Sequence, residues 1–194
     1  MIVEPVLLEG RCVRLEPLSL AHVPALIEVG LDPELWRWTA GSVKSAQEMK
    51  TYVGNALDRQ RQGTVVPFAT VERKTGRVIG STRFANIDPH DRRVEIGWTW
   101  IARPWQRTPI NTEAKYLMLR HAFETWICMR VEFKTDVLNA QSRAAILRIG
   151  AKEEGIFRNH MMMESGRIRD SIYFSIIDSE WPAVKRRLEE KLGL

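Results

Sequence analysis

The segment "WQRTPINTEAK", Trp105–Lys115, has the sequence of a helix N-terminus. Thr108 is a favoured N-cap residue, and Pro109 is favoured at the first helical position, where its fixed φ suits the turn. The first turn of a helix has free N–H groups and a partial positive charge, so it can bind a phosphate without a dedicated cation. The alternative is an ordinary amphipathic helix with a good start.

The segment continues into a helix predicted for Ile110–Met129. Its apolar residues recur at helical spacing and define one buried face. That face consists of Ala114, Leu117, Met118, Ala122 and Trp126. We expect this to be the central helix of the fold.

Three strands are predicted before the central helix. Two strand-like runs in residues 65–87 are separated by Lys74–Gly76, which predicts a hairpin. The third run is "VEIGWTWIA", Val94–Ala102. Because strand side chains alternate between the faces of a sheet, one face should carry Val94, Ile96, Trp98 and Trp100 and the other Glu95, Gly97, Thr99 and Ile101. The three strands predict an antiparallel meander.

The outer parts of the chain also alternate between strands and helices. Before the hairpin we predict a strand at 11–19, a helix at 20–30 and a helix at 45–62, in which Ser45 is the N-cap and Glu48 completes a capping box. After the central helix we predict a strand at 131–138, a helix at 139–150 between Asn139 and Gly150, two strands around Ser165–Gly166 and a helix at 181–194. This order predicts a mixed, partly antiparallel α/β sheet flanked by helices.

Composition indicates one folded domain over residues 1–194. The chain has 44% hydrophobic residues, enough for one sizeable core, and its 27% charged residues include both signs. The net charge of +5 is modest and no long basic block occurs, which makes nucleic-acid binding an unfavoured main role. A small phosphorylated ligand fits this charge at least as well.

The cysteines and histidines indicate the redox compartment and whether a metal site is expected. Cys12 and Cys128 are far apart and outside any CxxC spacing, which suits a reducing compartment. The four histidines show no metal-ligand spacing, so we expect no metal. No signal peptide and no apolar run of membrane-spanning length is apparent, so the expected location is the cytoplasm and no membrane partner is expected.

The element order, read together with its motifs, resembles the GNAT superfamily of acyl-CoA-dependent N-acyltransferases. In that family the turn before the central helix follows Q/R-x-x-G-x-G/A, and residues 106–111 occupy this position with Pro109 and Asn111 in place of the glycines. The branch of ribosomal-protein N-terminal acetyltransferases is similar in four further segments. These are "GRCVRLEPLSLAH", "VEIGWTWI", "NAQSRAAILRIGA" and "GRIRDSIYFSIIDSEWP".

The resemblance implies acetyl-CoA as the cosubstrate and a mostly antiparallel sheet that splays between its fourth and fifth strands to admit the pantetheine arm. It places the coenzyme against the end of the fourth strand, the turn, the start of the central helix and the late helix. The residues so implied are Trp100, Ile101, Gln106, Arg107, Thr108, Pro109, Ile110, Asn111, Thr112, Lys115 and Asn139. A homodimer is the usual expectation in this branch.

Two residues are candidates for proton transfer. Glu95 is the candidate base, because a partly buried carboxylate is suited to accepting a proton near neutrality; the alternative is a structural hydrogen-bonding role. The position at which many members carry a tyrosine acid is Ile146, which leaves Ser142 or an ordered water to protonate the thiolate. Asn139 and Ser142 have the alternative of acting only in the first turn of their helix.

The expected function is acetyl transfer from acetyl-CoA to a primary amine by direct attack in a ternary complex. A protein N-terminal α-amine is the preferred acceptor, and a small amine such as an amino acid, a polyamine or an antibiotic is the alternative. A third hypothesis is a member that binds acyl-CoA as a sensor without turnover, favoured by the replaced glycines and the missing tyrosine.

Overall fold

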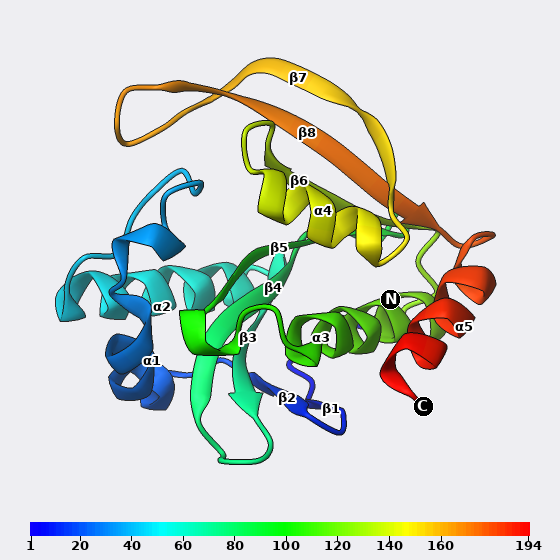
Figure 1. The fold of residues 1–194 in the computed structure, drawn as a ribbon, viewed down its shortest axis with the longest axis horizontal. Coiled ribbons are helices and arrows are strands. Elements are labelled where there is room, and N and C mark those ends of the chain that lie inside the picture. The colour runs from blue at the N-terminus through cyan, green and yellow to red at the C-terminus, as the bar shows by residue number, and fades with distance from the viewer.

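The computed structural model describes residues 1–194 and contains one eight-stranded sheet in the order β1-β2-β3-β4-β5-β6-β8-β7 (Figure 1). Every neighbouring pair is antiparallel except β5 and β6, which are parallel. The strands are β1 (Leu8–Glu9), β2 (Val13–Pro17), β3 (Val65–Glu72), β4 (Val78–Asp88), β5 (Arg93–Ile101), β6 (Arg130–Asp136), β7 (Lys152–Met162) and β8 (Ile168–Ile177). The predicted mixed sheet is confirmed, and β1 is an additional strand that the sequence pattern did not predict.

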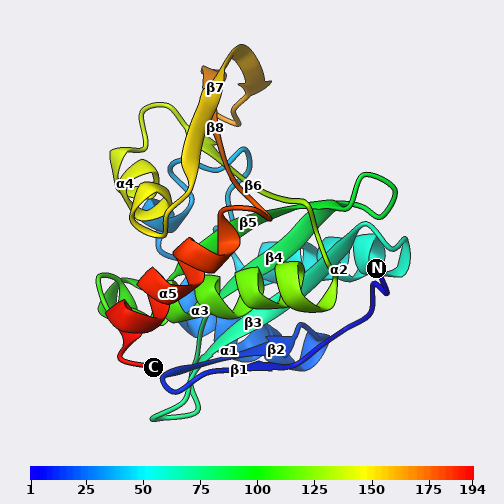
Figure 2. The ribbon, with the colours of Figure 1, turned by 90° about the vertical axis from the view of Figure 1, so that its right-hand side faces the viewer.

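Helices cover both faces of this sheet (Figures 1 and 2). The long helices are α1 (Val23–Gly30), α2 (Ala46–Arg61), α3 (Pro109–Arg120), α4 (Ala140–Arg148) and α5 (Trp181–Leu192). Helices α1 and α2 enclose a smaller core with Trp36 and Trp100, while α3, α4 and α5 contribute to the larger core on the other face. None of the helices combines the length and apolarity that a membrane span requires.

The predicted N-caps and turn glycines are present, but the predicted capping box at Ser45 is only half formed. Ser45 accepts from the Glu48 N–H at 3.2 Å, Thr108 caps α3, and Asn139 accepts from the Ser142 N–H at 3.0 Å. The Glu48 carboxylate accepts from the N–H of Lys44, one residue before the cap. Gly76, Gly150 and Gly166 have positive φ at the hairpin turn, the end of α4 and the β7–β8 turn. Local sequence therefore sets the ends of these elements.

A β-bulge in β5 makes the predicted face assignment wrong. Gly97 pairs with Arg83 and Trp100 pairs with Ser81, so two residues of β5, Trp98 and Thr99, lie opposite one residue of β4, Thr82. Trp98 lies in this bulge with a φ of 49°. Because the extra residue reverses the alternation, Val94 and Ile96 face the α3 core while Trp100 faces α1 and α2.

The central helix is shorter than predicted. Its α-helical part ends at Arg120, and His121–Thr125 form a π-helical turn. Ile127 then has a φ of 54°, and β6 begins at Arg130. The predicted apolar face is buried as expected, since all five of its members belong to the larger core. Apolar spacing alone does not reveal where the hydrogen-bonding pattern changes.

A carboxylate from α3 fixes the β1–β2 turn. Glu113 is buried and accepts the backbone N–H groups of Arg11 at 2.7 Å, Cys12 at 2.8 Å and Val13 at 2.9 Å. Burial alone would raise the pKa of Glu113, but hydrogen bonds from the Cys12 thiol and these amides hold the pKa below its usual range. Burial and the neighbouring carboxylate raise the pKa of the Cys12 thiol to about 12.

Candidate active site

The two parallel strands at the centre of the sheet separate after a short pairing. Residues Arg93–Glu95 of β5 pair with Arg130–Glu132 of β6, and no further pair joins the two strands. Both strands continue, because β5 pairs with β4 up to Ile101 and β6 pairs with β8 up to Asp136. The sheet therefore splays at the carboxyl ends of β5 and β6, where ligands commonly bind in sheets with parallel strands.

A tight turn joins the end of β5 to α3 at this opening. It includes the short 3-10 helix η3 (Arg103–Trp105), and the Gln106 side chain donates to the Ile101 carbonyl at 2.8 Å. Arg107 is exposed and has a φ of 60°, which lies in the left-handed region that residues other than glycine rarely adopt. Gln141, in the first turn of α4, contacts Gln106 at 3.4 Å. The starts of α3 and α4 thus meet at the splay.

The first turn of α3 has N–H groups without helical acceptors. Thr108 is the N-cap, Pro109 occupies the first helical position, and the N–H of Ile110 donates to the Thr108 hydroxyl at 3.4 Å. Helix geometry leaves the N–H groups of Thr108 and Asn111 without intrahelical partners. The side-chain Oδ1 of Asn111 is buried without a hydrogen-bond partner. This open polar turn can bind an anion such as a phosphate.

Lys115 lies one turn further along α3 and does not face the turn. Its side chain is 7% exposed, and its Nζ donates to the Thr82 hydroxyl at 3.1 Å and to the Thr99 hydroxyl at 2.6 Å. The structure therefore places this ammonium group against the sheet, which corrects the sequence-based expectation of a phosphate contact. Burial lowers the pKa of Lys115 to about 7.

The other predicted coenzyme contacts lie on three sides of the opening. Ile101 is at the end of β5, whereas the Trp100 side chain points away into the α1–α2 core and its indole N–H contacts the Tyr52 hydroxyl at 3.3 Å. Asn139 and Ser142 form the first turn of α4. Thr112, the fourth residue of α3, is buried. The Trp100 side chain therefore lies away from the opening.

Glu95 lies on the opposite face of β5 from α3 and is 3% exposed. Its Oε2 accepts from the Asn86 amide at 2.8 Å and pairs with the Lys134 ammonium group at 3.1 Å. Its Oε1 lies beside Gly97, where a Cβ would approach to 3.0 Å. The glycine at the start of the bulge therefore leaves room for this carboxylate oxygen.

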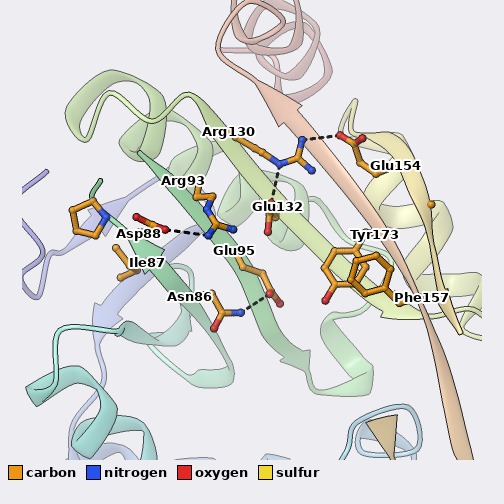
Figure 3. A pocket seen from close by; sticks show the side chains of 12 residues that line it. Asn86, Ile87, Asp88, Arg93, Glu95, Arg130, Glu132, Glu154, Phe157 and Tyr173 are labelled. Carbon is orange, nitrogen blue, oxygen red and sulfur yellow. Dashed lines mark hydrogen bonds and ion pairs between the residues drawn. The ribbon is translucent and has the colours of Figure 1, made fainter. Parts of the chain in front are cut away.

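Glu95 also lines a cavity of about 700 Å³ between the β4–β5 turn region and the β7–β8 hairpin (Figure 3). Figure 3 shows Glu95 between Asn86 and Tyr173. The lining carries four carboxylates, Asp88, Glu95, Glu132 and Glu154, but only two guanidinium groups, Arg93 and Arg130. The excess of negative charge favours a cationic group in the cavity.

A buried cation lies on the same face as Glu95. Arg83 of β4 is 4% exposed, and its Nε and Nη2 atoms are buried without hydrogen-bond partners. Its guanidinium group packs over the Tyr52 ring at 4.4 Å and near the Trp98 ring at 5.9 Å. Cation–π contacts partly compensate for the missing hydrogen bonds.

Three residues of this region are not marked by any pattern in the sequence, namely Asn86, Lys134 and Thr99. Asn86 and Lys134 hold the Glu95 carboxylate, and Thr99 holds the Lys115 ammonium group. Asn86 has a φ of 48° near the end of β4, but no periodicity signals such a residue. Lys134 follows the alternation of β6, whose pairing partner was not known from the sequence. These contacts depend on strand register, which local patterns do not specify.

Comparison with known proteins gives a consistent assignment. Residues 13–152 match the family model described as "Acetyltransferase (GNAT) domain". The "Putative ribosomal N-acetyltransferase YdaF" of Bacillus subtilis (strain 168) is 34% identical over 110 residues, which span 57% of this chain and 59% of that protein. The "Uncharacterized N-acetyltransferase p20" of Bacillus licheniformis is 24% identical over 171 residues, covering 86% of this chain and 93% of that protein.

Solved structures agree in fold along almost the whole chain. The crystal structure of a "putative acetyltransferase" from T. thermophilus has a TM-score of 0.89 and 36% identity, covering 99% of this chain and 100% of that one. Mycobacterium smegmatis RimJ, in complex with CoA-disulfide, has a TM-score of 0.80 and 23% identity, covering 97% and 93% of the two chains. The family model covers more than half of the chain, including the turn before α3 and the splayed strands β5 and β6, and it shows that the chain belongs to the GNAT acetyltransferase family.

Proposed function

We propose that the protein transfers an acetyl group from acetyl-CoA to a primary amine, with a protein N-terminal α-amine as the preferred acceptor. The observation that carries this proposal is the open first turn of α3 beside the splay of β5 and β6. Unpaired N–H groups in the turn would bind the diphosphate of the coenzyme. The splay would admit its extended arm, and the arm would run along β5 from Ile101 toward Glu95.

Asn111 and Gln106 support the fit of this turn to a diphosphate. The buried amide of Asn111 has an unsatisfied polar atom, and rotation of that amide would present its N–H₂ group to an anion. Gln106 ties the turn to the end of β5 at Ile101, so the phosphate-binding turn and the acyl-binding strand are held in fixed relation. Preorganised donors of this kind lose little entropy on binding.

The acceptor would enter from the carboxylate-rich cavity on the opposite face of β5. A protonated amine is attracted by the excess of carboxylates there and must lose a proton before it attacks the thioester carbonyl. Glu95 lines this cavity, and its Oε1 is beside Gly97 at the bulge. We assign Glu95 as the group that accepts this proton, directly or through one water.

Replacing Glu95 with glutamine tests this role. We expect kcat to fall about 100-fold, because general-base catalysis typically contributes at least that factor, while the dissociation constant of acetyl-CoA stays within threefold. Steady-state kinetics over pH 6 to 9 and calorimetric coenzyme titration measure the two effects. Glu124→Gln is the control, since Glu124 pairs with Lys185 and Trp181 away from the cavity. A normal rate for Glu95→Gln across this range would remove Glu95 from the mechanism.

The acceptor class is tested with a panel of amines. We expect peptides with free N-termini to release coenzyme A thiol faster than amino acids, polyamines or aminoglycosides, and the same peptides with acetylated N-termini to release none. Inert peptides and turnover of one small amine would replace the preferred acceptor with the small-molecule alternative. Tight acetyl-CoA binding without transfer to any amine would instead support a sensor. That alternative draws on Ile146, which stands where many family members carry a tyrosine acid.

A further inference from the structure

A lysine without a counter-ion is buried beneath α3 near the proposed thioester position. No carboxylate lies within ion-pair distance of Lys115, and its only polar contacts are the hydroxyls of Thr82 and Thr99. These come from β4 and β5, and Met118 is the neighbouring side chain on α3 itself. Glu95 and Lys134 face the other side of the sheet. Burial is the only cause that lowers the pKa of Lys115 to about 7.

Thr99 connects this lysine with the opening between the strands. It lies in the β5 bulge, in the stretch of β5 that has no pairs with β6, and it is exposed while Thr82 is fully buried. Thr99 Oγ1 lies 2.6 Å from Lys115 Nζ and 2.7 Å from Thr82 Oγ1. When the ammonium group donates to both hydroxyls, the Thr82 O–H can turn to Met118 Sδ at 3.8 Å. The Thr99 O–H then has only the Gly97 carbonyl as a protein acceptor, at 3.4 Å, and can turn from it to a ligand in the splay.

The late helix offers no comparable acid. Ile146 is buried in the larger core, so the position at which a tyrosine would be expected carries an apolar side chain. Ser142 lies in the first turn of α4, where its backbone N–H donates to the Asn139 side chain at 3.0 Å. In the stretch of β5 that is not paired with β6, Thr99 carries a hydroxyl that is hydrogen-bonded to a potential proton source, Lys115.

We propose that Lys115 and Thr99 form a proton relay to the departing coenzyme thiolate. The inference rests on the proposed acetyl transfer. As the amine nitrogen forms its bond to the acetyl carbon and the carbon–sulfur bond breaks, the electron pair of that bond leaves on sulfur. The Thr99 hydroxyl gives its proton to the sulfur and takes one from the Lys115 ammonium group. Neutral Lys115 is reprotonated from solvent through the exposed Thr99 hydroxyl.

Three substitutions separate this relay from a structural role. Lys115→Met removes the proton source, and Thr99→Val removes the connecting hydroxyl with little change of shape. Thr82→Val removes a hydrogen bond of the same lysine but leaves the path to the splay intact. We expect kcat to fall about 100-fold in the first two variants and by less than threefold in Thr82→Val, because general-acid catalysis is lost only in the former. The KM for acetyl-CoA should stay within threefold throughout.

The pH profile gives the decisive readout. Because Lys115 must be protonated to donate, kcat of the wild type should decline as pH rises above about 7, and this alkaline decline should be absent from Lys115→Met. Melting temperatures verify folding. If the wild type turns over and Lys115→Met keeps its rate and its alkaline decline, the relay is wrong but acetyl transfer stands. If the wild type acetylates no amine, the proposed function fails and the relay fails with it.

Discussion

Replacing Asn111 with glutamate should weaken coenzyme A binding about 100-fold, equivalent to about 2.7 kcal/mol, and should at the same time stabilise the fold. Asn111 is the third residue of α3 after the Thr108 cap, which is the position at which a glutamate completes a capping box. A carboxylate there accepts hydrogen bonds from the free backbone N–H groups of the first turn and repels the diphosphate. Calorimetric titration with coenzyme A measures the binding, and thermal melting measures the stability.

Asn111→Gln is the matched control, because it has the length of glutamate without its charge. Its coenzyme affinity should stay within fivefold of the wild type. Most binding-site substitutions lower stability and affinity together, so the opposite signs expected for Asn111→Glu distinguish loss of a phosphate site from damage to the fold. If Asn111→Glu binds coenzyme A as tightly as Asn111→Gln, the first turn of α3 is not the diphosphate site.

Replacing Glu113 with alanine should lower the free energy of unfolding by about 4 kcal/mol, because each buried amide that loses its acceptor costs roughly 1 to 3 kcal/mol. Three backbone N–H groups, those of Arg11, Cys12 and Val13, would lose their acceptor. For a chain of this length the corresponding decrease in melting temperature is about 10 °C. Calorimetry of the two proteins at pH 7 measures it.

The Glu113 effect should depend on pH in a defined direction. Because its folded-state pKa lies below the usual value, its contribution is present above that usual value and is lost as the pH falls through the folded-state pKa. The difference between wild type and Glu113→Ala should therefore shrink in acid. Glu190→Ala, at an exposed position of α5, is the control and should change the melting temperature by less than about 2 °C. A similarly small change for Glu113→Ala would refute the structural role.

Local patterns were sufficient to predict most of the fold. Capping residues such as Ser45 and Thr108 and the turn glycine Gly76 mark element ends through contacts that span only a few residues. The bulge at Trp98 and the π-helical turn after Arg120 have no such local marker. Strand periodicity assumes a continuous ladder, so one inserted residue put Ile96 and Trp100, which were predicted to share a face, on opposite faces of the sheet.

The candidate site was predicted less completely, because its contacts join distant strands. The choice of Glu95 came from its place on β5, but its cation, Lys134, comes from β6. A lysine on the second turn of α3 was expected to meet phosphate, whereas Lys115 points to Thr82 and Thr99. Which way a long side chain turns depends on the packing between helix and sheet, and helical spacing does not contain that information.

The carboxylate that closes the β1–β2 turn has a practical consequence for following the reaction. Thiol reagents attack the deprotonated form of sulfur. The Cys12 thiol, beside Glu113, has a pKa of about 12, and burial raises that of Cys128 to about 11. Both side chains stay protonated at neutral pH, so a chromogenic disulfide added during turnover responds to newly freed coenzyme with little background from the enzyme, and cysteine-free variants are unnecessary.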